Sequence, residues 1–320
     1  MNVLVTGSAG FIGSHAVERL LVDGHEVVGL DNFDAFYDRR TKQSNLEAAL
    51  VHHRYTFLEA DIRDTERMAE IFRRHGPFDA VMHLAAKAGV RPSIAEPRLY
   101  EEVNIAGTMN LLEAAVRSSR PTRFVFASSS SVYGNNPKVP FSETDPVDNP
   151  ISPYAATKKA GELICHTYHH LYDLPVFCLR FFTVYGPRQR PDLAIQKFIR
   201  KIFAGEPVPM YGDGSSSRDY TYIDDVIAGV RRAIDRCRGY EIINLGSRHP
   251  VVLKEMIEVV AEACGREAVI EPLPMQPGDM ERTFADVEKA ARLLDYKPSV
   301  PFREGVALQV EWVRRERLLA

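Results

Sequence analysis

The stretch TGSAGFIGSH, residues 6–15, follows an apolar run at the N-terminus and decides the fold class of this chain. Its glycines Gly7, Gly10 and Gly13 recur at every third position, directly after a predicted strand and at the start of a predicted helix. Glycines at such a turn let backbone amides approach a pyrophosphate, which binds at the helix N-terminus where the helix dipole is positive. The stretch therefore predicts a dinucleotide-binding turn.

Acidic residues at the ends of the next strands support this interpretation. Asp31 follows the glycines by about twenty residues, where a carboxylate accepts hydrogen bonds from an adenosine ribose and repels a 2′-phosphate. It favours NAD over NADP, although a turn or capping aspartate has the same local pattern. Asp61 is a candidate adenine contact or a helix cap. In HLAAKAG, residues 83–89, small residues follow the fourth strand where a cofactor must pass, and we expect His83 to be a packing residue.

Short apolar runs alternate with amphipathic segments through the first 182 residues. The runs predict strands over 2–7, 26–31, 55–61, 79–86, 123–129 and 176–182, and the intervening segments predict helices over 11–23, 98–118 and 153–172. Strands that are apolar on consecutive residues and separated by helices indicate a parallel sheet covered on both faces. The sequence therefore predicts an α/β fold with a doubly wound, parallel-sheet Rossmann domain.

The pattern changes after about residue 183. Prolines punctuate the chain, YGDGSSSRDY (211–220) indicates an exposed polar loop, and EIINLGS (241–247) is predicted to return to the sheet. Further helices are predicted near 253–264, 286–294 and 303–317. We expect an NAD-binding domain of residues 1–182 plus about 210–247. A smaller, discontinuous α/β lobe of about 183–209 plus 248–320 would bind substrate, with a ligand cleft between the two.

Composition excludes several classes of partner. The 320 residues are 45% hydrophobic with a net charge of −3, so no overall positive charge indicates a nucleic-acid partner. No apolar run approaches the ~20 residues of a membrane span, and the N-terminus lacks signal-peptide features, so we expect a cytoplasmic protein that does not enter membranes. Scattered cysteines without metal-ligand spacing predict free thiols and no metal site. They are Cys165, Cys178, Cys237 and Cys264.

A tyrosine and a lysine stand four residues apart in SPYAATKKAGE, residues 152–162. Tyr154 and Lys158 therefore face one side of a helix whose start is marked by Ser152 as N-cap and by Pro153. Tyrosine, with an ordinary pKa of about 10, is a poor base at neutral pH, but a lysine ammonium and a cationic nicotinamide both favour the phenolate. The spacing is common on surface helices and gains meaning here from the NAD turn and from the polar strand end FASSSSVYG, residues 126–134.

Together these motifs resemble the extended short-chain dehydrogenase/reductases of the nucleotide-sugar epimerase and dehydratase type. The resemblance covers essentially the whole chain: TGxxGFIG at 6–13, the acid at 31, HLAA at 83–86, SSxVYG at 129–134, YxxxK at 154–158 and GxxxRDYxYxDD at 214–225. It implies that Tyr154 is the catalytic base, Lys158 its partner and Ser129 the catalytic serine. The NAD-binding residues that it implies are Gly7, Gly10, Phe11, Ile12, Gly13, Asp31, Asn32, Asp61, Ile62, Leu84, Ala85, Ala86, Lys87, Tyr154 and Lys158.

The residues after Ser129 distinguish reactions within this family. Dehydratases resembling this chain carry Asp-Glu there, and UDP-glucuronate decarboxylases carry a glutamate at the second position. This chain has Ser130 and Ser131, which cannot perform that proton chemistry, so 4-epimerisation is favoured. Thr183 and Arg190 in RFFTVYGPRQRPD look like the UDP-glucuronate 4-epimerases, as do DNFDAFYD (31–38) and MQPGDM (275–280). UDP-galactose 4-epimerases usually have an asparagine in place of Thr183.

The chemistry of a uronic acid gives these residues a role. Oxidation at C4 makes a β-keto acid, which loses CO2 when its carboxylate bond aligns with the carbonyl. Donors predicted to hold the carboxylate away from that alignment are Ser130, Ser131, Thr183 and Arg190. Arg188 is an alternative to Arg190, backbone or surface roles stay open for Ser130, Ser131 and Arg190, and Arg180 is expected in a buried structural ion pair. The resemblance further implies Arg218 on the diphosphate, Tyr211 beside the uracil and Asp279 on the uridine ribose.

The sequence thus predicts NAD-dependent C4 epimerisation of a UDP-sugar, from UDP-glucuronate to UDP-galacturonate. Alternatives are a 4-epimerase of UDP-glucose/UDP-galactose or of a UDP-N-acetylhexosamine, a dehydrogenase that releases NADH, and a non-catalytic NAD-sensing binding protein. The resemblance also implies a homodimer formed through helices that include 98–118 and 153–172.

Overall fold

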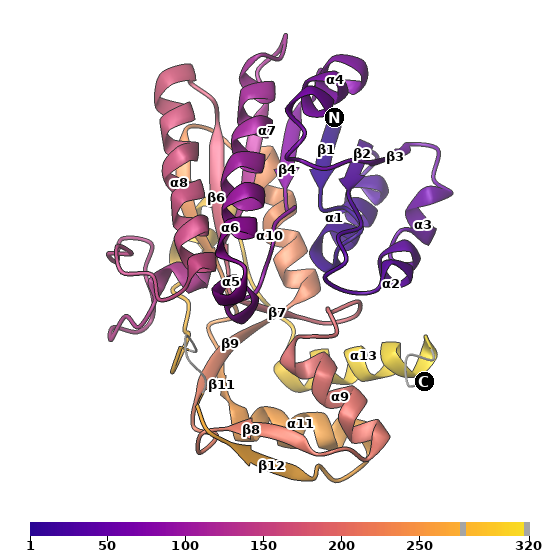
Figure 1. Ribbon diagram of the computed structural model, residues 1–320, viewed down its shortest axis with the longest axis vertical. Coiled ribbons are helices and arrows are strands. Elements are labelled where there is room, and N and C mark those ends of the chain that lie inside the picture. The colour runs from indigo at the N-terminus through magenta and orange to yellow at the C-terminus, as the bar shows by residue number, and fades with distance from the viewer. Residues whose placement is uncertain (276–279, 317–320) are drawn as a thin grey trace.

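Seven parallel strands form the central sheet in this computed structural model, which describes residues 1–275 and 280–316 (Figure 1). The strand order is β3-β2-β1-β4-β5-β6-β10, and every neighbouring pair is parallel. The order reverses between β1 and β4, where the carboxyl ends of parallel strands open a ligand-binding crevice. The strands are β1 (Asn2–Thr6), β2 (Glu26–Asp31), β3 (Tyr55–Glu59), β4 (Ala80–His83), β5 (Arg123–Ser129), β6 (Val176–Phe181) and β10 (Tyr240–Leu245).

These strands confirm the predicted sheet: β2 and β5 have the predicted bounds, and the other strands differ from the prediction by one to three residues at an end. The largest difference is at β4, which ends at His83 and not at residue 86. His83 is the last residue that pairs on both sides, with Thr6 of β1 and Phe126 of β5. Beyond Thr6 the chain has already turned into the glycine stretch, so residues 84–86 lose that neighbour and continue as a loop.

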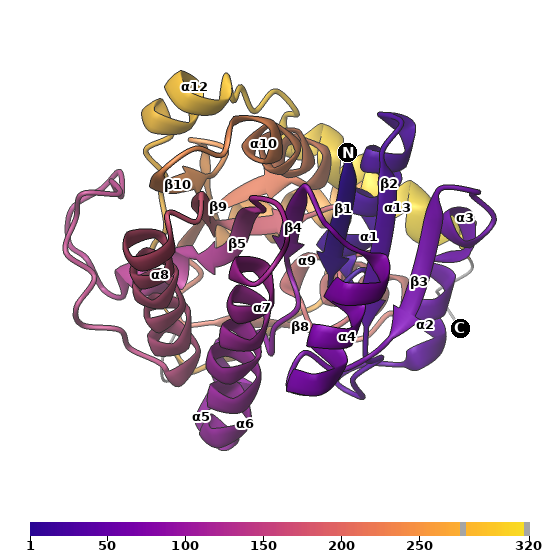
Figure 2. The ribbon, with the colours of Figure 1, turned by 90° about the horizontal axis from the view of Figure 1, so that it is seen from above.

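Helices cover both faces of the sheet (Figure 2). One face carries α4 (Thr65–His75), α7 (Gly107–Val116) and α8 (Pro153–Tyr172), and the other carries α1 (Phe11–Val22), α10 (Ile223–Arg236) and α12 (Glu288–Leu294). Val3 and Val5 enter one hydrophobic cluster and Leu4 enters the other, because alternate strand residues point to opposite faces. This double burial is the reason that the strands are apolar on consecutive residues.

The predicted helix over 98–118 is interrupted. It consists of α6 (Pro97–Glu101), a π-helical turn η1 (Glu102–Ala106) and α7. Short connecting helices that the sequence pattern did not reveal are α2 (Arg39–Ser44), α3 (Glu47–Leu50), α5 (Val90–Ala95) and the 3-10 turn η2 (Ser130–Tyr133). π-helical turns are frequent at functional sites.

A smaller lobe lies below the sheet in Figure 1. It contains the helices α9 (Ala194–Ala204), α11 (Leu253–Cys264) and α13 (Phe302–Arg315) and a two-stranded sheet of β8 (Val208–Tyr211) and β12 (Ile270–Leu273). A three-stranded sheet of β7 (Thr183–Tyr185), β9 (Ser217–Tyr222) and β11 (Pro250–Val252) lies between this lobe and the central sheet. The residue boundaries of the two domains stay a prediction.

The prediction of an exposed polar loop over 211–220 is wrong in its second half. Residues from Ser217 onward form β9, in which Asp219 is fully buried. Its carboxylate accepts hydrogen bonds from the backbone N–H groups of Ser247, Arg248 and Ala285. These donors are distant in sequence, so a local pattern of polar residues could not reveal that the aspartate is a buried anchor.

Candidate active site

The glycine turn between β1 and α1 is too tight for side chains. Gly7 has a φ of +71°, and a Cβ placed there would lie 2.8 Å from the backbone nitrogen of Ala85. A Cβ on Gly13 would lie 2.0 Å from the carbonyl oxygen of Gly7. The backbone therefore passes closely at these two glycines, and Gly10 is the N-cap of α1. This cradle fits the pyrophosphate of a dinucleotide.

Asp31 is 7% exposed at the end of β2, and its carboxylate joins two loops. One oxygen accepts the N–H of Ala9 at 3.1 Å and the other accepts the N–H of Phe33 at 2.8 Å. Burial raises the pKa of Asp31, against the opposing effects of the Lys42 charge and these N–H groups. A carboxylate has about four acceptor sites, so Asp31 can still receive ribose hydroxyls.

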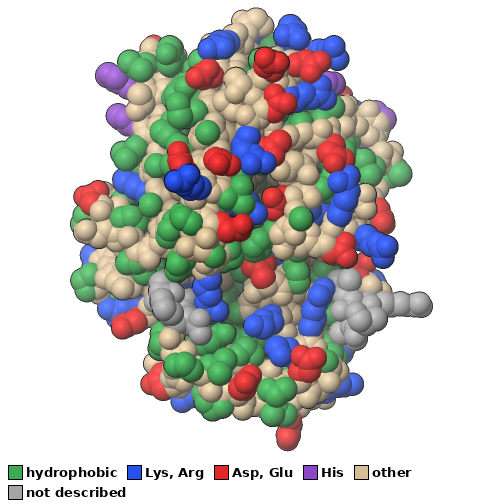
Figure 3. All heavy atoms as spheres, in the orientation of Figure 1, with side chains coloured by type: hydrophobic (Ala, Val, Ile, Leu, Met, Phe, Trp, Pro, Cys, Tyr) green, Lys and Arg blue, Asp and Glu red, His purple; other side chains and the backbone are tan. Residues whose placement is uncertain are grey.

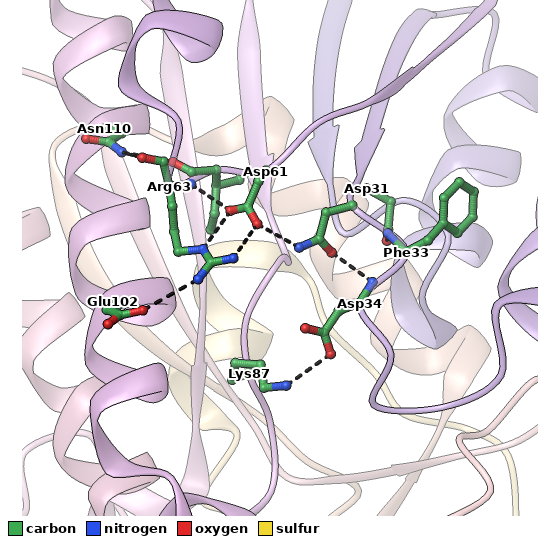
Figure 4. A network of polar contacts seen from close by, with 10 residues as sticks. Asp31, Phe33, Asp34, Asp61, Arg63, Lys87, Glu102 and Asn110 are labelled. Atoms are coloured by element: carbon green, nitrogen blue, oxygen red, sulfur yellow. Dashed lines mark hydrogen bonds and ion pairs between the residues drawn. The ribbon is translucent and has the colours of Figure 1, made fainter.

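The side chain of Asp61 lies between the loop after β2 and the loop after β3 (Figure 4). It accepts hydrogen bonds from the Asn32 amide at 2.9 Å and from the Arg63 guanidinium at 2.8 and 3.1 Å. The hydrogen bonds from Arg63 lower the pKa of Asp61 to about 2. Asp61 is therefore a fixed anion beside Asn32 and Ile62, and its contact with an adenine stays a prediction.

Residues 84–87 run from β4 toward α8 and are held by an asparagine, Asn104, that is absent from the predicted site residues. Asn104, in the π-helical turn, accepts the N–H of Lys87 at 2.8 Å and donates to the Lys87 carbonyl at 3.0 Å and to Thr157 Oγ1 at 3.1 Å. The Lys87 ammonium pairs with Asp34 at 3.0 Å (Figure 4). In the sequence, Asn104 is a polar residue within a predicted helix, and its burial becomes visible in the structure.

Tyr154, Lys158 and Ser129 lie together at the carboxyl ends of β5 and β6. Ser152 caps α8 by accepting the N–H of Ala155, as predicted. Burial raises the pKa of Tyr154, while a hydrogen bond with Ser129 and the positive charge of Arg190 oppose that rise. Burial lowers the pKa of Lys158 to about 8, and its ammonium donates to the Ala127 carbonyl at 2.7 Å. The Lys158 ammonium also lies 6.0 Å from the centroid of the Tyr154 ring, so its effect on the phenol stays a prediction, and Arg190 adds a second positive charge that the sequence did not assign to Tyr154.

The four serines have different surroundings. Ser128 is buried and donates to Glu162 at 2.6 Å beneath the site. Ser129 Oγ accepts the N–H of Ser131 and lies 3.1 Å from the Ser131 hydroxyl oxygen. Ser130 is 7% exposed in the turn that follows. Ser129 and Ser131 thus form a hydroxyl pair beside Tyr154.

Arg190 and Arg188 point to different places. Arg188 pairs with Glu18 of α1 at 2.7 Å, and its role as an alternative to Arg190 stays a prediction. The Arg190 guanidinium lies 5.1 Å from the Phe36 ring centroid, and its charge acts on Tyr154. Burial lowers the pKa of Arg190, but hydrogen bonds to Asp192 outweigh that effect and raise it. Thr183 begins β7 and is half-buried.

Helix α5 lies between Tyr154 and the smaller lobe. Ser93 Oγ accepts the N–H of Tyr154 at 3.1 Å, and the Arg91 guanidinium lies 4.8 Å from the Tyr211 ring centroid at the end of β8. Arg218, on β9, donates to the Ser217 carbonyl at 2.9 Å. Figure 3 shows Lys and Arg side chains gathered where the upper and lower parts meet, a surface suited to an anionic ligand. Asp279 lies outside the described residues.

One expected structural ion pair and one expected packing residue are present. Arg180 forms a buried ion pair with Glu162, with two contacts of 2.8 Å. His83 is buried between the hydroxyls of Thr6 and Thr108, and all four cysteines are buried free thiols. Within residues 1–275 and 280–316, no cluster of three or more His, Cys, Asp or Glu side chains suits a metal ion. In the same residues, no helix has the length and apolar character needed to cross a membrane.

Comparison with known proteins places the chain in a family. Residues 4–309 match the family model described as GDP-mannose 4,6 dehydratase. A UDP-glucuronate 4-epimerase of Thermodesulfobacterium geofontis is 42% identical over 311 residues, which are 97% of this chain and 95% of that relative.

Solved structures agree over the full length. The UDP-glucuronic acid 4-epimerase from Bacillus cereus, in complex with UDP-glucuronic acid and NAD, has a TM-score of 0.92 at 36% identity and covers 99% of this chain and 100% of its own. The NAD complex of the UDP-glucose 4-epimerase from Thermus thermophilus has a TM-score of 0.88 at 38% identity and covers 98% of this chain and 99% of its own. The chain therefore belongs to the GDP-mannose 4,6-dehydratase family of extended short-chain dehydrogenase/reductases.

Proposed function

We propose that this protein is an NAD-dependent UDP-glucuronate 4-epimerase that interconverts UDP-glucuronate and UDP-galacturonate. The observation that carries the proposal is the grouping of Ser129, Tyr154 and Lys158 with the charge of Arg190 beside the phenol. Full-length similarity to UDP-glucuronate 4-epimerases supports the same reaction.

NAD fits the crevice because the turn at Gly7 and Gly13 admits no side chain and Asp31 offers acceptors to a ribose. Bound NAD supplies reversible hydride transfer at C4 of the sugar. The remaining NAD contacts follow the predicted set in the loops after β1, β2, β3 and β4. Lys158, whose ammonium donates to the Ala127 carbonyl, would also hold the nicotinamide ribose.

Proton transfer belongs to Tyr154. Its phenol takes the proton of the C4 hydroxyl group. It returns the proton after the 4-keto sugar has rotated to present its other face, while Ser129 donates a hydrogen bond to the reacting oxygen. The positive charge of Arg190 favours the phenolate against the effect of burial. The chain thus needs one acid–base group in both directions, with no net oxidation of the substrate.

Specificity for a uronic acid rests on donors near the C5 substituent. Thr183, Ser130, Ser131 and Arg190 hold the sugar carboxylate away from the alignment that releases CO2. Arg218, Tyr211 and Asp279 bind the UDP portion, with Arg91 stacked on Tyr211.

Incubation with UDP-glucuronate and, separately, UDP-glucose tests the proposal. Chromatography should show UDP-galacturonate from the first and little conversion of the second. Thr183→Val and Arg190→Gln should each lower kcat/KM for UDP-glucuronate or release CO2 and a UDP-pentose. Wild-type kinetics in both variants without pentose would overturn the assignment of the carboxylate site, and equal conversion of UDP-glucose would favour the neutral-hexose alternative.

The family model is named for a dehydratase, and one observation speaks against that reaction here. Removing water needs an additional acid and base, and the positions after the catalytic serine hold Ser130 and Ser131. Their hydroxyls do not titrate near neutral pH. A product with an altered C6 group would contradict this argument.

We also propose that the protein is a homodimer formed through α7 and α8. These helices pack side by side on one face of the sheet (Figure 2). They leave large apolar side chains exposed, which favours association with a second copy. The exposed residues are Met109, Leu163, Leu171 and Tyr172. A cytoplasmic location is consistent with buried, unpaired cysteines.

A further inference from the structure

Arg190 already has a carboxylate partner from its own chain. Asp192 Oδ1 accepts from Arg190 Nε at 2.9 Å, and Asp192 Oδ2 accepts from Nη2 at 2.8 Å. Both oxygens therefore bind one edge of the planar guanidinium, the strongest geometry for this kind of pair. The Arg190 side chain is 17% exposed and that of Asp192 is 40% exposed.

Hydrogen bonds between buried glutamines hold the segment around Arg190, and the Phe36 ring covers one side of its guanidinium. Gln189 donates to the Val184 carbonyl at 2.9 Å and accepts the N–H of Gln196 at 3.1 Å. Gln309 of α13 donates to the side-chain oxygens of both these glutamines at 2.9 Å. All three amides are buried, and the Phe36 ring lies on the guanidinium. A cation held in such a place needs a counter-ion.

We propose, on the basis of the function proposed above, that Asp192 is a placeholder for the substrate carboxylate. It neutralises Arg190 when no uronic acid is bound, and it competes with the uronate for the same cation. Since two carboxylates then share one guanidinium, Asp192 weakens uronate binding and reduces discrimination against neutral hexoses. The residue is a specificity determinant that acts through Arg190 and need not touch the sugar.

Kinetics give the sign of the effect. Asp192→Asn keeps the shape of the side chain and removes its charge. The placeholder role predicts a KM for UDP-glucuronate at least tenfold lower in the variant, with the KM for UDP-glucose unchanged or higher. A role limited to orienting Arg190 predicts the opposite, a higher KM for UDP-glucuronate, and that result would overturn the proposal.

Thermal unfolding with saturating NAD gives a second readout that does not need turnover. Asp192→Asn should lower Tm in the absence of substrate by about 2 °C or more. UDP-glucuronate should restore this loss with a larger upward shift in the variant than in the wild type, whereas UDP-glucose should not. Glu206→Gln is the matched control, because it also removes one charge from an exposed ion pair, with Lys201 at 3.1 Å. Its shifts with both nucleotides should equal those of the wild type.

The double variant Arg190→Gln/Asp192→Asn isolates the shared cation. The gain in uronate selectivity should disappear in it, and persistence of the gain would show that Asp192 acts without Arg190. If UDP-glucuronate stabilises the wild type but Asp192→Asn shows no selective restoration and no gain in selectivity, the placeholder role is wrong and the proposed function stands. If UDP-glucuronate neither stabilises nor is converted by the wild type, the proposed function fails and the placeholder role fails with it.

Discussion

At the scale of single residues, the proposed function makes the phenol of Tyr154 the acid–base group of the reaction. Tyr154→Phe should lower kcat by about 10² to 10⁴, the usual contribution of a positioned acid–base group. Binding of NAD and of UDP-glucuronate should persist, because the ring stays packed beside Tyr100. Steady-state rates and calorimetric titration measure the two effects. Tyr168→Phe, the same change near the C-terminal end of α8, is the control and should keep full activity. Full activity in Tyr154→Phe would instead support a binding role for the protein.

His83 predicts how stability depends on pH. Burial lowers its pKa to about 3, so the unfolded chain binds one more proton than the folded chain between about pH 6.5 and pH 3. Its contribution to stability is therefore present above pH 6.5 and is lost as the pH falls through that window, by up to about 1.4 kcal/mol per pH unit.

Replacing the imidazole tests this titration. His83→Asn should make the free energy of unfolding less steep in pH between 6 and 4.5, whatever the absolute stability of the variant. Denaturant unfolding at several pH values measures the slope. Equal slopes in variant and wild type would mean that His83 takes up its proton in the folded state.

At the scale of elements, the ion pair of Arg180 and Glu162 fixes α8 to β6. Both side chains are at most 1% exposed, and Ser128 of β5 donates to the same carboxylate. Arg180→Met should destabilise the fold by about 3–5 kcal/mol, because it leaves a buried carboxylate without its cation. The double variant Arg180→Met/Glu162→Met should recover much of that loss, as measured by urea unfolding. A double variant as unstable as the sum of the single variants would argue against a specific pair.

Element positions were largely predictable, and the exceptions have a common cause. The alternation of apolar runs and amphipathic segments predicts the seven strands and the long helices, because each element buries its own face. The interruption at Glu102–Ala106 and the burial of Asp219 in β9 were not predictable. Both depend on hydrogen-bond partners that lie far away in the sequence.

At the scale of the whole molecule, the exposed apolar residues of α7 and α8 predict an assembly. Leu163→Glu and Leu171→Glu together should convert the homodimer into a monomer, because charges in an apolar interface lose their hydration. Size-exclusion chromatography with light scattering measures the mass. Val22→Glu is the control: Val22 is 81% exposed at the end of α1, a helix of the other face. A change in mass in the control alone, or in neither protein, would contradict this interface.

The sequence by itself determined the fold class and the glycine turn after the first strand, and it supplied the residues that we propose as the reacting groups. These features are local, because spacing along the chain is enough to indicate them. The glycines are Gly7, Gly10 and Gly13, and the tyrosine and lysine of the second motif are one helical turn apart. The tertiary structure alone revealed that the charge of Arg190 also acts on the phenol of Tyr154. It separates Arg188, paired with Glu18, from Arg190 beside Tyr154, two residues along the chain. It also brings Asn104 into hydrogen-bonding contact with Lys87 and pairs Arg190 with the carboxylate of Asp192. Electrostatics and hydrogen bonding depend on distance in space, which folding sets and spacing along the chain does not.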